Sequence, residues 1–393
     1  MKPLAVTAFS IVSPLGRGRA ATLEALRGRR SGLRPNDFAD APLETWIGRV
    51  DGLEEAPLDG ELGHYDCRNN RLAALGFEAD GFAAAVASAR DRYGAGRVAV
   101  LLGTTTSGIA ETERAWRERK PDGSLPRWYR YRETHNLFSL ADFVRRRARL
   151  EGPATTVSTA CSSSAKVFAA AQRLIEAGFA DAAVVGGVDT LCRMTLHGFH
   201  SLELLSRGPC RPCDAERDGL SIGEAAGFAL LERAAPSASG LALLGYGESS
   251  DAYHMSSPHP QGAGAVAAMR AALDRAGVRP HEVDYINLHG TGTPANDRAE
   301  DAAVHAVFGD AMTCSSTKGW TGHTLGAAGI VEAVVALLCL EHGLMPGSLN
   351  MRRVDPAFRS RVALDAEARP LRRVLSNSFG FGGSNCSLLF GAA

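Results

Sequence analysis

The sequence has no excess of charge of either sign, because 43 lysines and arginines balance 43 aspartates and glutamates in 393 residues. A protein that binds nucleic acid or an anionic membrane through a broad basic surface would carry such an excess. We therefore expect no nucleic-acid partner, and only local basic patches for docking. Hydrophobic residues make up 45% of the chain and charged residues 22%, which is the composition of a folded protein.

Long hydrophobic runs are also missing, and the cysteines follow no recognisable pattern. No segment approaches the roughly 20 apolar residues of a membrane span. The apolar stretch Leu4–Val12 runs into a Ser-Pro-Leu-Gly turn, which favours a buried first strand over a signal peptide. The eight cysteines show no disulfide-framework spacing, and Cys210-x-x-Cys213 lacks the further ligands of a zinc site. We expect a cytoplasmic protein without a membrane span or a metal centre.

What is present is an alternation of strand and helix patterns. Short β-rich runs such as Val98–Leu102 and Tyr285–Leu288 lie between alanine-rich helical stretches such as Ala165–Ala177 and Ala327–His342. This alternation predicts an α/β fold with buried, largely parallel strands.

The length predicts two halves rather than one core, since a single core seldom grows beyond roughly 250–300 residues. The Pro/Ser/Gly segment Ala234–Gly240 has linker chemistry, which places the halves at residues 1–235 and 236–393. A β run, a small polar turn and a helix ending in glycine occur near Cys161 and again near His323. This weak internal symmetry suggests a duplicated core.

Cys161 is the first candidate for chemistry. The run Thr155–Lys166 predicts a strand, a turn of small residues and a helix that begins beside this cysteine. Unpaired N–H groups at a helix start favour a thiolate, and the small neighbours leave room for an acyl group. The alternative is an inert buried cysteine.

Three other segments add polar groups. His289 follows a predicted strand and enters a Gly/Thr turn, while Lys318 and His323 lie in a glycine-rich approach to a helix that carries Glu332. A structural histidine and a plain ion pair are the alternatives. The Gly-Phe-rich segment Ser376–Asn385 lacks a lysine and opens no predicted helix, so we interpret it as a loop of main-chain donors rather than a phosphate loop, or else as a hinge. A cysteine, two histidines, a lysine and a donor loop together describe a thioester site.

In this combination the sequence resembles the elongating β-ketoacyl–acyl carrier protein synthases of the thiolase superfamily. The matching motifs span nearly the whole chain and are Val12-Ser-Pro-Leu-Gly16, Val157-Ser-Thr-Ala-Cys161-Ser-Ser, Arg211-Pro-Cys-Asp-Ala-Glu-Arg-Asp-Gly219, Ser249-Ser-Asp-Ala-Tyr-His-Met-Ser-Ser-Pro258, His289-Gly-Thr-Gly-Thr-Pro294, Lys318-Gly-Trp-Thr-Gly-His323 and Ser376-Asn-Ser-Phe-Gly-Phe-Gly-Gly383. The resemblance implies a thiolase-like fold of two duplicated halves packed as five layers, αβαβα.

The resemblance also implies roles for individual residues. Cys161 would carry the acyl chain, His289 and His323 would donate to the malonyl thioester oxygen, and the amides of Cys161 and Phe381 would form an oxyanion hole. Lys318 and Glu332 would form a supporting buried pair. The implied substrate contacts are Thr291, Thr293, Phe199, Asp251, His254 and Phe379, where Phe381, Asp251 and His254 would gate the acyl pocket.

The resemblance implies partners as well. An acyl carrier protein would supply the phosphopantetheine arm, so no separate cofactor is expected. Arg68, Arg71 and Arg207 are the candidates for docking it. The implied assembly is a homodimer or a heterodimer with a related subunit. The resemblance leaves a structural monovalent cation at Asn287, Glu332, Ser376 and Asn377 as an open alternative to a site without a metal.

Departures from the family pattern put the substrate in doubt rather than the reaction. The stretch Leu205–Asp214 is short, Cys213 replaces a usual aromatic residue, and Arg127–Arg132 looks unlike fatty acid synthases. Decarboxylative condensation in fatty acid or related elongation is the expected activity. A ketosynthase of an aryl polyene or type II polyketide pathway is the alternative. A non-catalytic chain-length subunit is disfavoured, because it has no need of the full nucleophile and donor set.

Overall fold

The structure is a computed structural model that describes residues 1–233 and 240–392. Its N-terminal half contains a five-stranded sheet in the order β6-β5-β7-β9-β1. β5 lies parallel to β6 and β7, whereas β9 is antiparallel to both β7 and β1. The strands are β1 (Leu4–Ser13), β5 (Val98–Gly103), β6 (Ala154–Val157), β7 (Ala182–Asp189) and β9 (Ala225–Arg233).

The C-terminal half repeats this topology in the order β12-β11-β16-β17-β10. β11 lies parallel to β12 and β16, and β17 is antiparallel to β16 and β10. The strands are β10 (Leu241–Ser250), β11 (Tyr285–Asn287), β12 (Thr313–Ser315), β16 (Arg373–Gly380) and β17 (Ser384–Ala392). When the five strands of each half are counted in chain order, the first strand pairs with the fifth, and the second strand lies between the third and the fourth. The core is therefore duplicated, as the sequence suggested.

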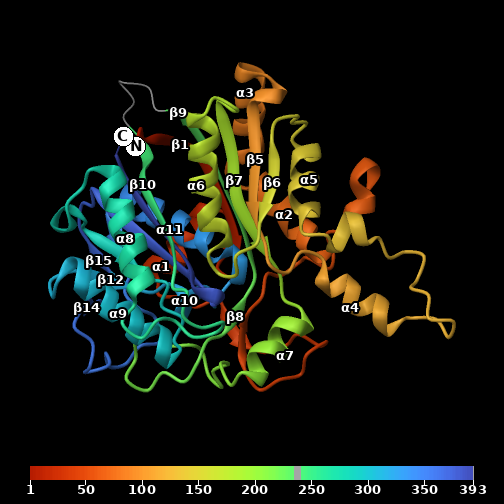
Figure 1. Cartoon of the computed structure of the whole chain (residues 1–393). Coiled ribbons are helices and arrows are strands. Elements are labelled where there is room, and N and C mark those ends of the chain that lie inside the picture. The colour runs from red at the N-terminus through yellow and green to blue at the C-terminus, as the bar shows by residue number, and fades with distance from the viewer. Residues whose placement is uncertain (234–239, 393) are drawn as a thin grey trace.

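Helices and sheets alternate in five layers (Figure 1). α6 (Ser163–Glu176) and α11 (Ala328–His342) pack against each other between the two sheets. The outer face of the first sheet carries α2, α3 and α5, and that of the second carries α8 and α9. Their bounds are Arg68–Glu78, Phe82–Tyr93, Phe138–Arg147, Ala263–Ala276 and Pro294–Phe308. This arrangement confirms the predicted αβαβα order.

Glycines permit the close contacts of the central layer. A Cβ on Gly329 would lie 2.5 Å from the Ala165 nitrogen, and one on Gly103 would lie 2.4 Å from the Ser164 nitrogen. Real side chains cannot approach backbone so closely. The first turn of α6, which follows Cys161, therefore sits tightly between β5 and α11.

The two sheets meet along β1 and β10, where Leu4 pairs with Leu243. The predicted junction at Ala234–Gly240 lies almost entirely outside the described residues, because 234–239 are not described. The 235/236 boundary stays a prediction.

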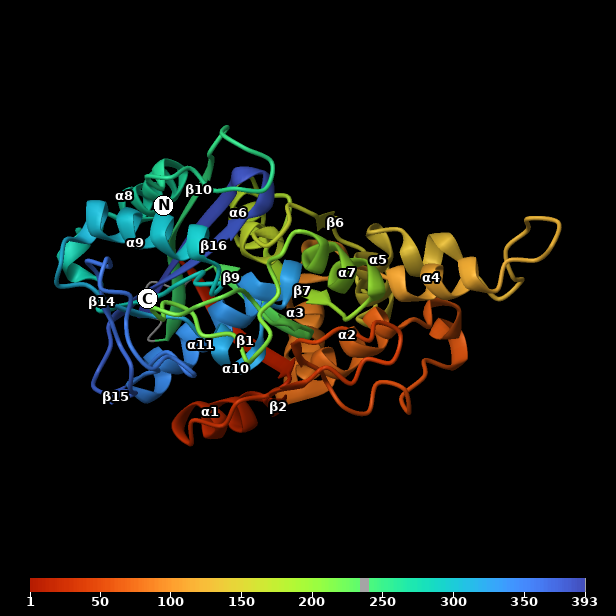
Figure 2. The same ribbon diagram turned by 90° about the horizontal axis from the view of Figure 1, so that it is seen from below.

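Smaller elements cap the core. After α4 (Ile109–Arg117) the chain runs outward as an arm and then turns back toward the core (Figure 2). The remaining elements are β2 (Gly16–Arg17), β3 (Leu33–Pro35), β4 (Trp46–Gly48), β8 (Ile222–Gly223), β13 (Leu344–Met345), β14 (Arg361–Val362), β15 (Glu367–Ala368), α1 (Arg19–Arg27), α4 (Ile109–Arg117), α7 (Arg193–Ser201) and α10 (Lys318–Thr321), with short 3₁₀ or π turns at Gly60–Tyr65, Ala79–Gly81, Ala95–Arg97, Tyr131–His135, Pro280–Glu282, Leu325–Ala327 and Phe381–Gly383.

Two helical stretches are long and apolar enough to cross a membrane by length and composition alone, Arg68–Tyr93 and Leu325–His342. The first joins α2 and α3 across a turn at Asp80, whose φ is 57°. The second contains α11, and 83% of its apolar window is buried between the sheets. Core helices pass the same test, so this finding is weak evidence for a span.

Candidate active site

Cys161 sits in a tight turn between β6 and α6. Ala160 adopts a left-handed conformation with φ 51°, which is costly for a residue with a side chain and is typical of functional turns. The Ser163 hydroxyl accepts a hydrogen bond from the Thr159 N–H at 2.8 Å, and a Cβ on Gly380 would lie 2.8 Å from the Thr159 oxygen. The turn is thus held from both sides, and it presents a Cys161 side chain that is only 5% exposed.

The Cys161 thiol faces His323. Its Sγ lies 2.9 Å from the His323 Nε2. Burial raises the pKa of Cys161 to about 11, although the Lys318 charge and the Phe381 backbone N–H oppose that rise. Burial and Lys318 hold the pKa of His323 well below its usual value. Burial therefore opposes the thiolate that the helix start was predicted to favour, and the thiolate stays a prediction. The 2.9 Å contact places the His323 Nε2 where it can accept the thiol proton.

Lys318 fixes the second histidine. Its buried ammonium donates to the His289 carbonyl and to the Glu332 carboxylate, and lies 3.3 Å from the His289 Nδ1. An ammonium can only donate, so Nδ1 is the acceptor and the proton of neutral His289 lies on Nε2. Burial, then Lys318 and His323, hold the pKa of His289 well below its usual value. His289 is therefore a neutral hydrogen-bond donor.

The three reactive groups converge. One ligand atom from each of Cys161, His289 and His323 lies within 4.8 Å of the others, and the two imidazole rings are 5.3 Å apart at 85°. Such a trio also has the spacing of a metal site. The neighbouring Lys318 ammonium disfavours a second cation. A nucleophile with two hydrogen-bonding imidazoles accounts for the set better, and the absence of a metal stays a prediction.

Glu300 is a functional position that the sequence reasoning missed. Its buried carboxylate accepts the N–H groups of His289 at 2.8 Å and Gly290 at 2.7 Å. Burial raises the pKa of Glu300 to about 7, against the pull of these donors. A glutamate on the buried face of α9 just after the His289 turn was the signal that could have revealed it.

The four residues proposed for a monovalent cation do not act as one set. Asn377 donates to Glu300 at 3.1 Å, and Glu332 is bonded by Lys318 and by Ser378. Asn287 and Ser376 are partners across the β11/β16 pair, and within the described residues the Asn287 Oδ1 and Ser376 Oγ atoms are buried without a hydrogen-bond partner. Two of the four donors thus fit a cation, and the site stays a prediction.

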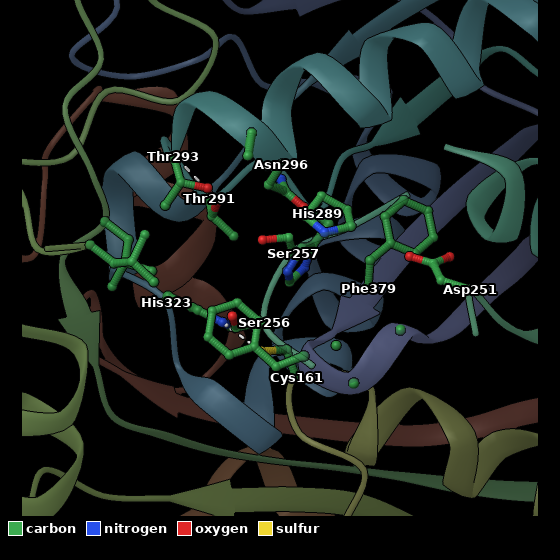
Figure 3. A pocket seen from close by; sticks show the side chains of 18 of the residues that line it. Cys161, Asp251, Ser256, Ser257, His289, Thr291, Thr293, Asn296, His323 and Phe379 are labelled. Carbon is green, nitrogen blue, oxygen red and sulfur yellow. Dashed lines mark hydrogen bonds between the residues drawn. The ribbon is translucent and has the colours of Figure 1, made fainter. Parts of the chain in front are cut away.

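A cavity of about 240 Å³ leads to the cysteine. Figure 3 shows Thr291 and Thr293 together on one side of this cavity and Phe379 with Asp251 on the other. The two threonine hydroxyls are 2.9 Å apart. The Phe199 and Phe381 rings lie 5.6 Å apart and both contribute to the wall. The residues predicted to bind substrate therefore line the cavity, with one exception.

His254 is that exception. It is exposed, it does not line the cavity, and its Nδ1 accepts the Ser256 N–H at 3.2 Å. Ser256 and Ser257 of the same loop line the wall instead, and a gating role for His254 stays a prediction. Asp251 does join the two loops: it accepts from Asn385 at 2.8 Å, and its N–H donates to the Gly383 carbonyl at 2.9 Å.

Arg68 is a second correction. Its side chain is only 10% exposed, because its guanidinium binds both carboxylate oxygens of buried Glu224, at 2.6 and 2.9 Å, and also Glu54. It is therefore not free to dock a partner. Arg71 is half-buried and paired with Asp66, whereas Arg207 is exposed. Arg71 and Arg207 remain the predicted contacts for an acyl carrier protein.

Comparisons with known proteins identify one family. The family models "Beta-ketoacyl synthase, N-terminal domain" and "Beta-ketoacyl synthase, C-terminal domain" match residues 72–237 and 241–352. A relative from Arabidopsis thaliana named mitochondrial 3-oxoacyl-[acyl-carrier-protein] synthase is 41% identical over 260 residues, 61% of this chain. The aligned part spans 56% of that relative's length.

Two further proteins align along the whole chain. A 3-oxoacyl-[acyl-carrier-protein] synthase 2 from Vibrio cholerae is 31% identical over 98% of both chains. A ketosynthase from Xenorhabdus doucetiae, solved in complex with its chain length factor, is 39% identical with a TM-score of 0.90, and the match covers 100% of this chain and 98% of that one.

Proposed function

Because this chain belongs to the β-ketoacyl synthase family, we propose that it is a β-ketoacyl–acyl carrier protein synthase. It would join an acyl chain held on Cys161 to a malonyl unit, with loss of carbon dioxide. The observation that carries this proposal is the Cys161 Sγ at 2.9 Å from the His323 Nε2, beside a His289 whose tautomer Lys318 sets.

In the first half-reaction the thiol attacks the acyl thioester of a carrier protein. The S–H proton passes to the His323 Nε2, and the departing pantetheine thiolate takes up a proton in turn. A thiol with a pKa of about 11 needs this acceptor, because little thiolate exists at neutral pH. The N–H groups of Cys161 and Phe381 are the proposed donors to the oxyanion.

In the second half-reaction a malonyl thioester loses carbon dioxide. The electron pair of the broken C–C bond becomes an enolate, whose oxygen accepts the Nε2–H of His289. In the acylated protein no thiol proton faces the His323 Nε2, so His323 in its Nε2–H tautomer is the second donor. The carbanion attacks the acyl carbonyl, the C–S bond breaks, and the Cys161 sulfur leaves as a thiolate that takes up a proton from water to regenerate the thiol. No strong base is required, which suits two imidazoles whose pKa values burial keeps low.

The proposed partners follow from this chemistry. Thr291 and Thr293 would contact the phosphopantetheine arm, which the acyl carrier protein supplies as part of the substrate. Arg207 and Arg71 would meet the acidic carrier surface. We propose a dimer whose second subunit is a copy or a related chain, and the Xenorhabdus ketosynthase with its chain length factor supports the related chain.

A specialised pathway is the second candidate. The Xenorhabdus ketosynthase, which is 39% identical over the full chain and was solved with a chain length factor, is consistent with a ketosynthase of an aryl polyene or type II polyketide pathway. A non-catalytic chain-length subunit is disfavoured, because Cys161, His289, His323 and Lys318 converge in one site.

The test is intact mass spectrometry of the protein mixed with a panel of acyl–carrier proteins, beside Cys161→Ala. A mass gain equal to the acyl group in the native protein, absent in the variant, would support the proposal. No gain with any donor, in the presence of a candidate related subunit, would contradict it. The preferred chain would separate saturated from polyene or polyketide use.

A further inference from the structure

α7 contributes Phe199 to the wall of the acyl cavity, and most of its own side chains are not buried. Of its residues Arg193–Ser201, only Leu196 is buried. Phe199 projects from its last turn into the cavity wall, with its ring 5.6 Å from that of Phe381. The position of this helix therefore sets the position of the Phe199 ring in the cavity wall.

The N-terminus of α7 lacks a cap from its own sequence. Cys192 occupies the N-cap position without a side-chain hydrogen bond to the helix backbone, and the first turn holds no acidic residue. A helix start leaves N–H groups unpaired and positive, and they must find acceptors elsewhere.

Glu113 of α4 supplies those acceptors. Its Oε2 accepts the Arg193 N–H at 3.0 Å and its Oε1 accepts the Met194 N–H at 2.7 Å. Within the described residues this carboxylate makes no other hydrogen bond and no ion pair. Figure 2 shows α4 beside α7, with the outward arm continuing from the far end of α4.

The other end of α7 is anchored differently. The Leu204 N–H donates to the Phe199 carbonyl at 3.1 Å, and the Leu220 N–H donates to the Leu204 carbonyl at 2.9 Å. Leu204 and Leu220 also line the cavity. α7 is thus held at its C-terminal end by these leucines and in its middle by buried Leu196. Leu191, just before the helix, is buried and its N–H donates to Glu224, so Glu113 holds only the first N–H groups of the helix itself.

We propose that Glu113 is a positioning residue for acyl-chain selection, which acts by fixing α7 and hence Phe199. The inference rests on the proposed function and deepens it. It makes the depth of the acyl cavity depend on α4, an element outside the catalytic groups. Releasing the helix start lets Phe199 withdraw from Phe381, so chains of different length and shape are accepted more equally.

The test compares native protein with Glu113→Ala and Glu113→Gln. The readout is the ratio of kcat/KM for Cys161 acylation by the most and the least preferred acyl chain. Glu113→Ala should compress this ratio about fivefold, which corresponds to about 1 kcal/mol. Glu113→Gln keeps one acceptor oxygen and should fall between. Glu118→Ala is the control, because Glu118 lies just beyond α4 and contacts Arg114 and Trp128 rather than α7.

An equal loss of rate for all chains, or an unchanged ratio, would overturn the inference, since a merely structural role would leave selection intact. A second readout does not depend on activity. Hydrogen–deuterium exchange of the segment 190–202 should be faster in Glu113→Ala than in the native protein and in Glu118→Ala, because two N–H groups lose their acceptor. Unchanged exchange in Glu113→Ala would overturn the inference. This readout does not require acylation, so it stays separate from a failure of the proposed function, in which the native protein would accept no acyl chain.

Discussion

Replacing Lys318 by methionine should reduce both stability and condensation, and a double variant should separate the two losses. The ammonium is 2% exposed and bonds Glu332, the His289 carbonyl and the His289 ring. Removing one member of a buried ion pair costs about 3–5 kcal/mol, because the remaining charge has no partner.

The size of this loss should depend on pH. Burial already raises the pKa of Glu332, against the pull of the Lys318 ammonium. Without the ammonium, that pKa rises further and the carboxyl stays protonated to higher pH. The destabilisation of Lys318→Met should therefore be smaller at pH 5.5 than at pH 8.5, where an ionised Glu332 would be buried alone.

The double variant Lys318→Met/Glu332→Gln removes both charges. It should recover most of the lost unfolding free energy, since no buried charge is left unpaired. Condensation should stay reduced by about 100-fold or more, because nothing then fixes the His289 proton on Nε2 and a preorganised donor is lost. Urea unfolding at both pH values and the rate of β-ketoacyl formation are the assays. Condensation at the native rate in the double variant would refute the argument that Lys318 sets the His289 tautomer.

Three further predictions concern the surroundings of the site. His323→Ala should slow alkylation of Cys161 by iodoacetamide about tenfold at pH 7.5, because a thiol with a pKa near 11 loses its proton acceptor, and an unchanged rate would show that His323 does not assist. Gly329→Ala should lower the unfolding free energy by about 1–3 kcal/mol, as its Cβ would meet the Ala165 nitrogen at 2.5 Å, while Gly96→Ala, which meets nothing, should not; calorimetry measures both. Glu300 has a pKa of about 7, above its usual value of 4.5, so its contribution to stability is full below pH 4.5 and is lost as pH rises through 7. Glu300→Gln should remove that dependence, amounting to about 3 kcal/mol, and parallel pH profiles of stability in the two proteins would contradict it.

The sequence allowed the reacting groups to be predicted, but not their protonation. The reacting groups lie in short motifs that can be recognised from residue type, order and spacing alone; they are Cys161, His289, His323 and Lys318. The state of the thiol depends on how deeply the turn is buried, and that depth comes from α11 and the loop at Gly380, which are distant in the sequence. Helix-start chemistry alone therefore omits the burial that raises the pKa of Cys161.

The supporting carboxylates were hidden for a related reason. Glu300, Glu224 and Glu113 all accept N–H groups, and most of these belong to other segments of the chain. Such acceptors leave no motif, because any carboxylate that reaches the donors would serve. Arg68 was misassigned to a docking surface on the same account, since its partner Glu224 is 156 residues away in the sequence.

More of the fold than of the supporting contacts could be predicted from the sequence. Glycines at helix ends and buried β-rich runs predicted α/β halves, and the repeated strand order in the structure confirms the duplication. The pairing of β1 with β9 and β10 could not be predicted, because all these strands are buried runs of similar composition with no register signal.

The most direct test of the account is to isolate the protein with its acyl chain on Cys161 and add malonyl–carrier protein in a single turnover. The native protein should release carbon dioxide and yield the β-ketoacyl product two carbons longer. His289→Ala should acylate normally but remain acylated. Product formation by His289→Ala at the native rate, or a native acyl-enzyme that does not react with malonyl–carrier protein, would contradict the assignment of decarboxylative condensation to this site.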